Sequence, residues 1–108
     1  MPSYSKYDVI LVRYPFSDRS SSKVRPAVVI NNPHSSQDLF VVPLTSQLSN
    51  LLVGEFILNN WKEAGLNVPS AVKRGLYTLH ETLVVKSVGK FSQRDCQELQ
   101  NSLDTWLR

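Results

Sequence analysis

Short runs of β-branched residues, separated by turn-forming residues, are the feature that most constrains the fold of this chain. Valine, isoleucine and leucine dominate the runs, while proline, asparagine, aspartate and serine fill the segments between them. Connections this short predict antiparallel strands joined by hairpins. We expect strands over residues 9–14, 27–30, 39–44, 53–58, 76–80 and 83–88.

The C-terminal segment changes to a helical period. Its apolar residues recur at spacings of 3, 4, 3 and 1, which places on one helix face Cys96, Leu99, Leu103, Trp106 and Leu107. Ser92 and Asp95 approximate a capping box at the start of this helix, and residues 59–66 predict one helical turn ended by Gly65. The fold class is therefore mainly β with α (α+β): a small SH3-like antiparallel β-barrel with a C-terminal α-helix.

The length and composition predict one globular domain spanning residues 1–108. The 42% hydrophobic content is ordinary, and no apolar stretch approaches the roughly 20 residues of a membrane span. The N-terminus has no small-residue cleavage pattern after its apolar run. We expect a cytoplasmic protein with no membrane association.

The single cysteine, Cys96, excludes an internal disulfide, and its place on the helix face indicates a small buried hydrophobic residue rather than a nucleophile. With only His34 and His80 besides, no cluster has metal-ligand spacing, so we expect neither a metal nor another cofactor. The net charge of +3 permits a polyanionic partner without requiring one.

Arg25 and Pro26 stand where a cationic, serine-rich loop meets a buried strand. Proline biases the residue before it toward an extended backbone, so Arg25 is set in a strand-like conformation. By alternation, Arg25 shares a face with Ala27 and Val29, whose burial would anchor the strand. The preceding loop, residues 17–23, offers hydroxyls and cations that could drape over a nucleotide backbone.

Several segments in order resemble the PemK/MazF family of toxin ribonucleases from bacterial type II toxin–antitoxin systems. The resemblance covers nearly the whole chain, through "YDVILVRYPFSD", "SSSKVRPAVVI", "VVPLTSQ", "AGLNVPSAVK" and "LYTLHETLVVKSVGKFSQRD". The most specific parts are the aromatic-Pro-Phe at residues 14–16, the Arg-Pro before a Val/Ile strand, the Thr-Ser after the third strand, and the Pro-Ser following "AGL".

This resemblance implies a homodimer of SH3-like barrels that cuts single-stranded RNA without a metal and is silenced by a cognate antitoxin protein. Cleavage of this kind proceeds by attack of the RNA 2′-hydroxyl on the neighbouring phosphate, which leaves a 2′,3′-cyclic phosphate and a 5′-hydroxyl. The resemblance assigns the catalytic roles to Arg25 and Thr45. The residues expected to bind RNA are Ser17, Arg19, Ser20, Ser22, Lys23, Ser46, Ser70, Lys73 and Arg74.

Structural alternatives exist for several of these residues. Thr45 and Ser46 could form a hydroxyl-mediated turn, and Ser70 could do the same after a proline. Arg25 could form a surface ion pair with Asp18 or Glu55.

The sequence also departs from the family. Serines 20–22 stand where many members have glycine, and residues 72–80 contain no carboxylate, so the general base is not identified. His80, beside a glutamate at a strand end, is interpreted as structural.

Two other classes of function share this fold type. One is a non-enzymatic toxin that, like CcdB, poisons a protein target such as gyrase, and the other is a plain SH3-like binding module. Arg25 and Thr45 favour the ribonuclease over both.

Overall fold

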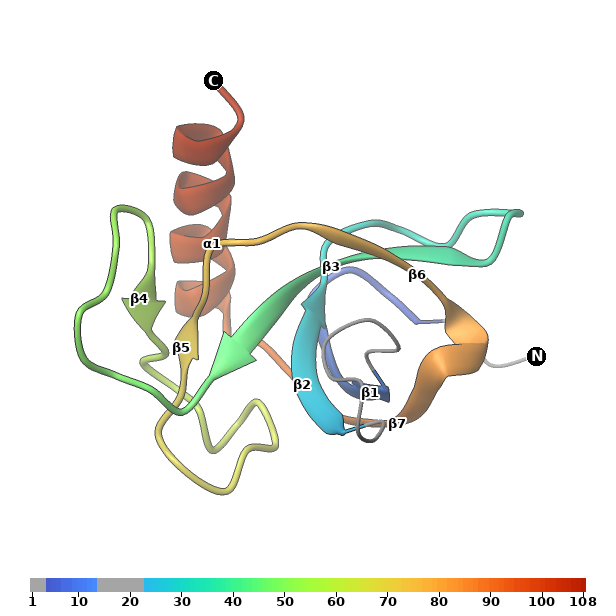
Figure 1. Ribbon diagram of the computed structural model, residues 1–108, viewed down its shortest axis with the longest axis horizontal. Helices are drawn as coiled ribbons and strands as arrows, with labels where there is room; N and C mark the ends of the chain where they lie inside the picture. Colours follow the sequence, from blue (N-terminus) through green and yellow to red (C-terminus); the bar gives the residue numbers. More distant parts are fainter. Residues whose placement is uncertain (1–3, 14–22) are drawn as a thin grey trace.

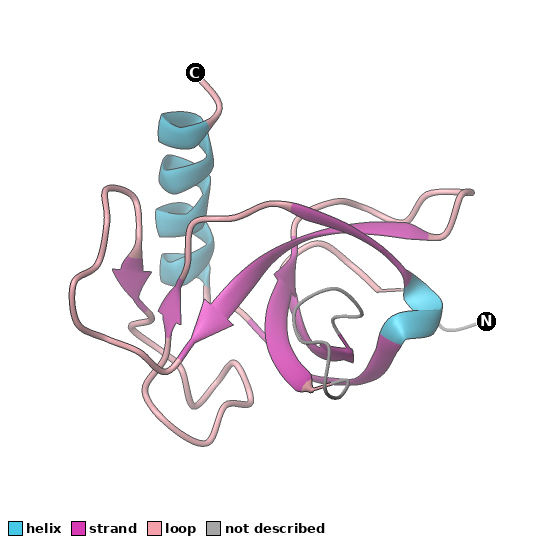
Figure 2. Ribbon diagram, in the orientation of Figure 1, coloured by secondary structure: helices cyan, strands magenta, loops and turns pink. Residues whose placement is uncertain are grey.

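The computed structural model describes residues 4–13 and 23–108, so the predicted strand end at Tyr14 and most of the serine-rich loop lie outside the described residues. The described elements are seven strands, one 3-10 helix and one C-terminal α-helix (Figure 2). In chain order they are β1 (Asp8–Arg13), β2 (Val24–Val29), β3 (Asp38–Thr45), β4 (Phe56–Ile57), β5 (Ala71–Val72), β6 (Tyr77–His80), η1 (Glu81–Leu83), β7 (Val84–Lys90) and α1 (Gln93–Trp106).

The strands form one antiparallel sheet that bends strongly around a common centre (Figure 1). Its order is β4-β5-β3-β2-β1-β7, and β6 pairs with the first half of β3. Within the described residues no ladder joins β6 to β7, and η1 links them instead. The predicted α+β fold with an SH3-like sheet and a C-terminal helix is confirmed, with the barrel left open between these two strands.

Apolar residues occupy successive positions in β1, β2 and β3 because both faces of the sheet are buried. In β2, Ala27 and Val29 belong to one core cluster, together with Ile10 and Leu79, while Val28 between them belongs to a second. The second cluster includes residues of α1, which stands against the sheet next to β3 and β5 (Figure 1). Because both faces are buried, the sequences of these strands are continuous apolar runs.

The helix α1 begins as predicted. The Ser92 hydroxyl accepts a hydrogen bond from the backbone N–H of Asp95 at 3.2 Å, which caps the first turn. Leu99 and Leu103 are buried on the face that meets the sheet. Leu107, expected on the same face, follows the last helical residue and is 65% exposed. No helix among the described residues is long and apolar enough to cross a membrane.

One predicted element is wrong in extent. The strand expected over residues 53–58 contains only β4, because Gly54 has a φ of 88° and lies in a turn that α1 holds. The backbone oxygens of this turn accept hydrogen bonds from the Ser102 hydroxyl and the Trp106 indole N–H. The single helical turn predicted within residues 59–66 is present, because Ala64 N–H bonds to the carbonyl of Asn60 and Gly65 follows with a φ of 84°.

Candidate functional site

A cavity of about 780 Å³ lies where β1, β2 and β3 meet the segment that precedes β5. Four of the described residues that line it are cationic and none is acidic. These cations are Lys23, Arg25, Lys73 and Lys86. A cavity with this composition favours an anionic ligand with more than one charge.

Arg25 and Thr45 both line this cavity, and the sheet brings them there together. The ladder between β2 and β3 ends with Ala27 opposite Pro43, so each of the two polar residues stands two positions beyond that last pair. On its other side Arg25 pairs with Val12 of β1. Since Ala27 and Val12 are fully buried, the exposed Arg25 side chain projects from a rigid backbone.

The Thr45 hydroxyl takes part in a turn as well as in the cavity wall. It accepts a hydrogen bond from Gln47 N–H at 3.0 Å, so the turn foreseen as an alternative for Thr45 is present. As an acceptor in that bond, the hydroxyl keeps its own hydrogen to donate. Ser46, which follows, is exposed and also lines the cavity.

Ser70 lines the cavity but is almost fully buried, at 3% exposure. Its hydroxyl donates to the carbonyl of Val68 at 3.0 Å, which is the turn foreseen as its alternative role. Its own carbonyl accepts from Leu58 N–H, so Ser70 also ties β5 to the end of β4. The bond to Val68 directs the Ser70 hydroxyl hydrogen toward the protein.

Lys73 lines the cavity, whereas its neighbour Arg74 does not. Arg74 donates its backbone N–H to the Glu55 carboxylate at 2.8 Å, and Leu52 N–H donates to the same group at 2.7 Å. These two bonds lower the pKa of Glu55. Within the described residues no ion pair joins Arg25 to Glu55. Ser17, Asp18, Arg19, Ser20 and Ser22 lie outside the described residues.

One wall of the cavity depends on two glycines. Gly65, which lines the cavity, has a φ of 84°, and a Cβ at this position would lie 2.0 Å from the carbonyl oxygen of Val88. A Cβ on Gly89 would lie 2.5 Å from the backbone of Ala64. Only glycine at both positions allows the 59–66 segment to pack this closely on β7.

Sequence reasoning missed several cavity residues. Gln47, Asn67, Tyr77 and Lys86 all line the cavity, but none was singled out as a site residue. Lys86 stands close to Lys90 in the sequence, and only the strand pairing shows which part of the molecule it faces. It is opposite Leu11 of β1, which in turn is opposite Pro26 of β2.

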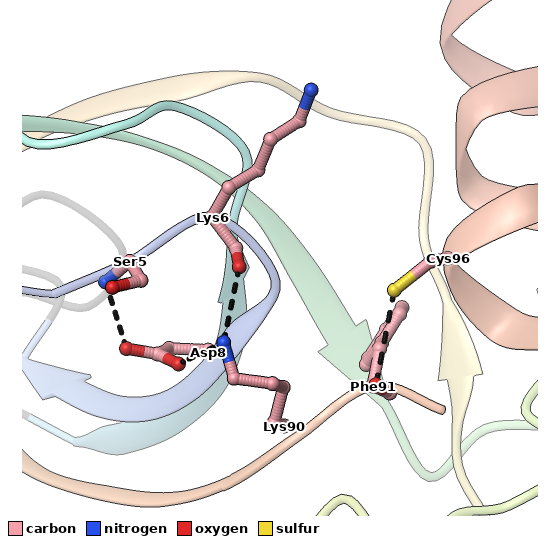
Figure 3. A network of polar contacts seen from close by, with 6 residues as sticks. All are labelled: Ser5, Lys6, Asp8, Lys90, Phe91 and Cys96. Atoms are coloured by element: carbon pink, nitrogen blue, oxygen red, sulfur yellow. Dashed lines mark hydrogen bonds and ion pairs between the residues drawn. The ribbon is translucent and has the colours of Figure 1, made fainter. Parts of the chain in front are cut away.

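Cys96 and His80 do not line the cavity. The Cys96 thiol lies 3.8 Å from the carbonyl oxygen of Phe91, and partial burial raises its pKa, which is unfavourable for a nucleophile (Figure 3). His80 caps η1, accepting Thr82 N–H at 3.2 Å, in keeping with its structural interpretation. Among the described residues no group of three His, Cys, Asp or Glu side chains is placed to hold a metal ion.

The family model for the PemK-like, MazF-like toxins of type II toxin–antitoxin systems matches residues 5–107. The chain therefore belongs to this family of toxins, and the resemblance found in the sequence is confirmed. The enzyme class predicted from the sequence, an endoribonuclease, is the one characteristic of MazF-like toxins. The comparison with curated proteins gave no significant match.

Solved structures share the fold at low sequence identity. MazF from Deinococcus radiodurans superposes with a TM-score of 0.78 at 16% identity, covering 99% of this chain and 98% of that one. An endoribonuclease in complex with its cognate antitoxin, from a mycobacterial species, gives 0.76 at 14% identity, covering 97% and 95%. The toxin MazF-mt6 of Mycobacterium tuberculosis gives 0.71 at 16% identity, covering 93% and 95%. These matches establish the fold over nearly the full length of this chain and of each matched chain.

Proposed function

We propose that this toxin is a metal-independent endoribonuclease that cleaves single-stranded RNA in the cytoplasm, with Arg25 and Thr45 at the catalytic centre. Cleavage of messenger RNA would inhibit translation and growth. The observation that carries the proposal is the position of Arg25 and Thr45 in one cavity whose described lining has four cations and no carboxylate. Polyanionic RNA fits such a lining.

In the proposed reaction the 2′-hydroxyl oxygen of RNA forms a bond to the adjacent phosphorus. The bond from phosphorus to the 5′ oxygen of the next nucleotide then breaks, and the products are a 2′,3′-cyclic phosphate and a 5′-hydroxyl. Negative charge gathers on the non-bridging oxygens in the transition state. The forked donors of Arg25 stabilise this charge, and the Thr45 hydroxyl donates one further hydrogen bond.

The proton of the 2′-hydroxyl leaves to a base, and a proton must reach the departing 5′ oxygen. Arg25 is a poor base because its guanidinium holds its charge, but it can assist the departing oxygen by hydrogen bonding. The described cavity lining offers no carboxylate as base. Lys23 and Lys73, together with Arg19, would contact phosphates beside the reacting one, while Ser46, Ser70, Arg74 and serines 17, 20 and 22 would contribute further RNA contacts.

A homodimer and an antitoxin complete the proposal. Two-fold pairing would align two cavities in one basic channel, since a chain this small covers few nucleotides alone. The antitoxin would occupy that channel with a disordered, acidic segment that folds on binding. That one structural neighbour is in complex with its cognate antitoxin supports this arrangement.

The test is incubation of the purified protein with a long single-stranded RNA in EDTA. Discrete fragments that end in 2′,3′-cyclic phosphate are expected. Intact RNA would contradict the proposal and would leave a toxin with a protein target, or a binding module, as the alternatives.

A further inference from the structure

Lys86 is fixed at the edge of the cavity by strand pairing. Three strands place Lys86, Leu11 and Pro26 side by side, on β7, β1 and β2. All three line the cavity, and Arg25 directly precedes Pro26. Two strand spacings separate the backbones of β7 and β2, which is about 10 Å.

The surroundings of Lys86 differ from those of Lys90 on the same strand. Lys90 forms an ion pair with Asp8 at 3.1 Å and lies within reach of the Lys6 carbonyl at 3.5 Å (Figure 3). Lys86 has no such ion pair among the described residues, and it faces a cavity in which the described lining contains no carboxylate. Its charge is therefore available to an anionic ligand.

The separation between β7 and β2 can be compared with the spacing of phosphates along an RNA strand. Along one strand of a duplex, successive phosphates advance by roughly 3.4 Å along the axis, and a single-stranded chain can extend further. Where the two side chains extend side by side into the cavity, a backbone separation of about 10 Å sets them against different phosphates, because it exceeds one phosphate step.

We propose that Lys86 binds a non-scissile phosphate of the RNA, one or two linkages away from the phosphate held by Arg25. The inference rests on the proposed ribonuclease function and adds a requirement on the substrate. The substrate must be an oligonucleotide that carries a charged linkage on the β7 side of the reacting phosphate. Lys86 then contributes to binding in the ground state and in the transition state alike, without taking part in the chemistry.

The test uses short RNA oligonucleotides built around one site that the wild-type protein cleaves. Each modified oligonucleotide carries one neutral methylphosphonate. It replaces either the first or the second linkage on one side of the scissile phosphate, and both sides are tested. Wild-type protein, Lys86→Gln, Lys86→Arg and the control Lys90→Gln are compared on each substrate and on the unmodified one. Thermal unfolding verifies that all variants are folded.

On the unmodified RNA, Lys86→Gln should raise KM about tenfold with kcat within about twofold. The salt dependence of binding should fall by about 0.7 in slope. Lys86→Arg should restore KM, and Lys90→Gln should change neither quantity. At one methylphosphonate position the wild-type KM should rise similarly, and Lys86→Gln should cause no further loss there, because the contact is already absent.

An unchanged KM and salt slope in Lys86→Gln, with wild-type cleavage intact, would overturn the inference while leaving the proposed function standing. An increase in KM by the same factor on every substrate would also overturn it, because no single phosphate would then be the partner of Lys86. Failure of the wild-type protein to cut any of the RNAs would instead contradict the ribonuclease function itself, and the role of Lys86 with it.

Discussion

Two charged sites of this protein, the carboxylate in the first turn of α1 and the cations of the cavity, are built in opposite ways. Asp95 is fully buried, and its oxygens accept hydrogen bonds from the backbone N–H groups of Asn59 and Asn60, each at 2.9 Å. The Asn59 side-chain amide donates a further bond, also at 2.9 Å. In the cavity, by contrast, Arg25 and Lys86 are exposed and meet no carboxylate of the described lining.

This difference separates charge used for folding from charge used for binding. The hydrogen bonds to Asp95 come from the protein, so the carboxylate ties the start of α1 to the segment that continues to the cavity wall at Gly65. Arg25 and Lys86 extend from paired strands into a lining whose described part has no carboxylate, so both charges can serve an anionic ligand. Loss of the first kind of charge should reduce stability, and loss of the second should reduce activity.

The largest expected effect is on activity, from Arg25→Ala. Removing a preorganised donor to developing negative charge costs about 10²–10³ in rate, and a lone arginine on a phosphoryl group can exceed this. We expect RNA cleavage and growth arrest to be lost, while the midpoint of thermal unfolding stays near that of the wild type. Cleavage assays and circular dichroism measure the two quantities.

Two further variants sharpen this test. Arg25→Lys should also fail, since a point charge does not reproduce the fork of the guanidinium. Arg94→Ala removes the same charge from the exposed side of α1, away from the cavity, and should cleave normally. Near-normal turnover by Arg25→Ala would show that the assignment is wrong.

On the folding side, Asp95→Ala should give the largest loss of stability. The substitution removes the acceptor of two partly buried hydrogen bonds from the N–H groups of Asn59 and Asn60, so the free energy of unfolding should fall by about 3 kcal/mol. Urea unfolding measures the loss. Asp104→Asn, at an exposed position near the end of the same helix, is the matched control and should be close to neutral. Equal stabilities for the two variants would contradict the proposed role of Asp95.

A smaller effect on activity is expected from Thr45→Ala. One hydroxyl among several donors is worth about tenfold in kcat, less than Arg25, because the charge on arginine strengthens its hydrogen bonds. Thr45→Ser keeps the hydroxyl, and with it both the bond from Gln47 N–H and the proposed bond to phosphate. Single-turnover cleavage should therefore show Thr45→Ser near the wild type. If the serine variant were as slow as the alanine variant, the hydroxyl would not be the group that matters.

Much of the fold could be predicted from local sequence, because its signals act over short distances. Alternation and turn residues located the main strands, and the period of α1 together with Ser92 located its start. The strand predicted over residues 53–58 failed because the Gly54 turn depends on Ser102 and Trp106, some 50 residues along the chain. Tertiary contacts override propensity in such a segment.

The candidate site was predictable only in part, for the same reason. The Arg-Pro and Thr-Ser motifs pointed to Arg25 and Thr45, which the fold brings to one cavity. Lys86 could not be placed, since the pairing of β1 with β7 contains register shifts on either side of the Ile10–Leu11 pairings. A one-residue shift moves a side chain to the other face of a sheet, so simple alternation does not predict which lysine lines the cavity.

The smallest expected effect concerns Glu55 and the stability of the protein in acid. Backbone N–H groups of Leu52 and Arg74 bind its carboxylate, which lowers its pKa below the ordinary value of 4.5. The folded state therefore favours the ionised form, so the stabilisation is fully present above pH 4.5 and is lost as the pH falls through the lowered pKa. Glu55→Gln should unfold more easily than the wild type at pH 7, and the difference should shrink toward zero in stronger acid. Glu63→Gln, an exposed position that makes the same charge change, should show no such convergence. Urea unfolding from pH 7 down to pH 3 measures both curves, and parallel curves for Glu55→Gln and the wild type across that range would mean that the carboxylate does not stabilise the turn beside Lys73.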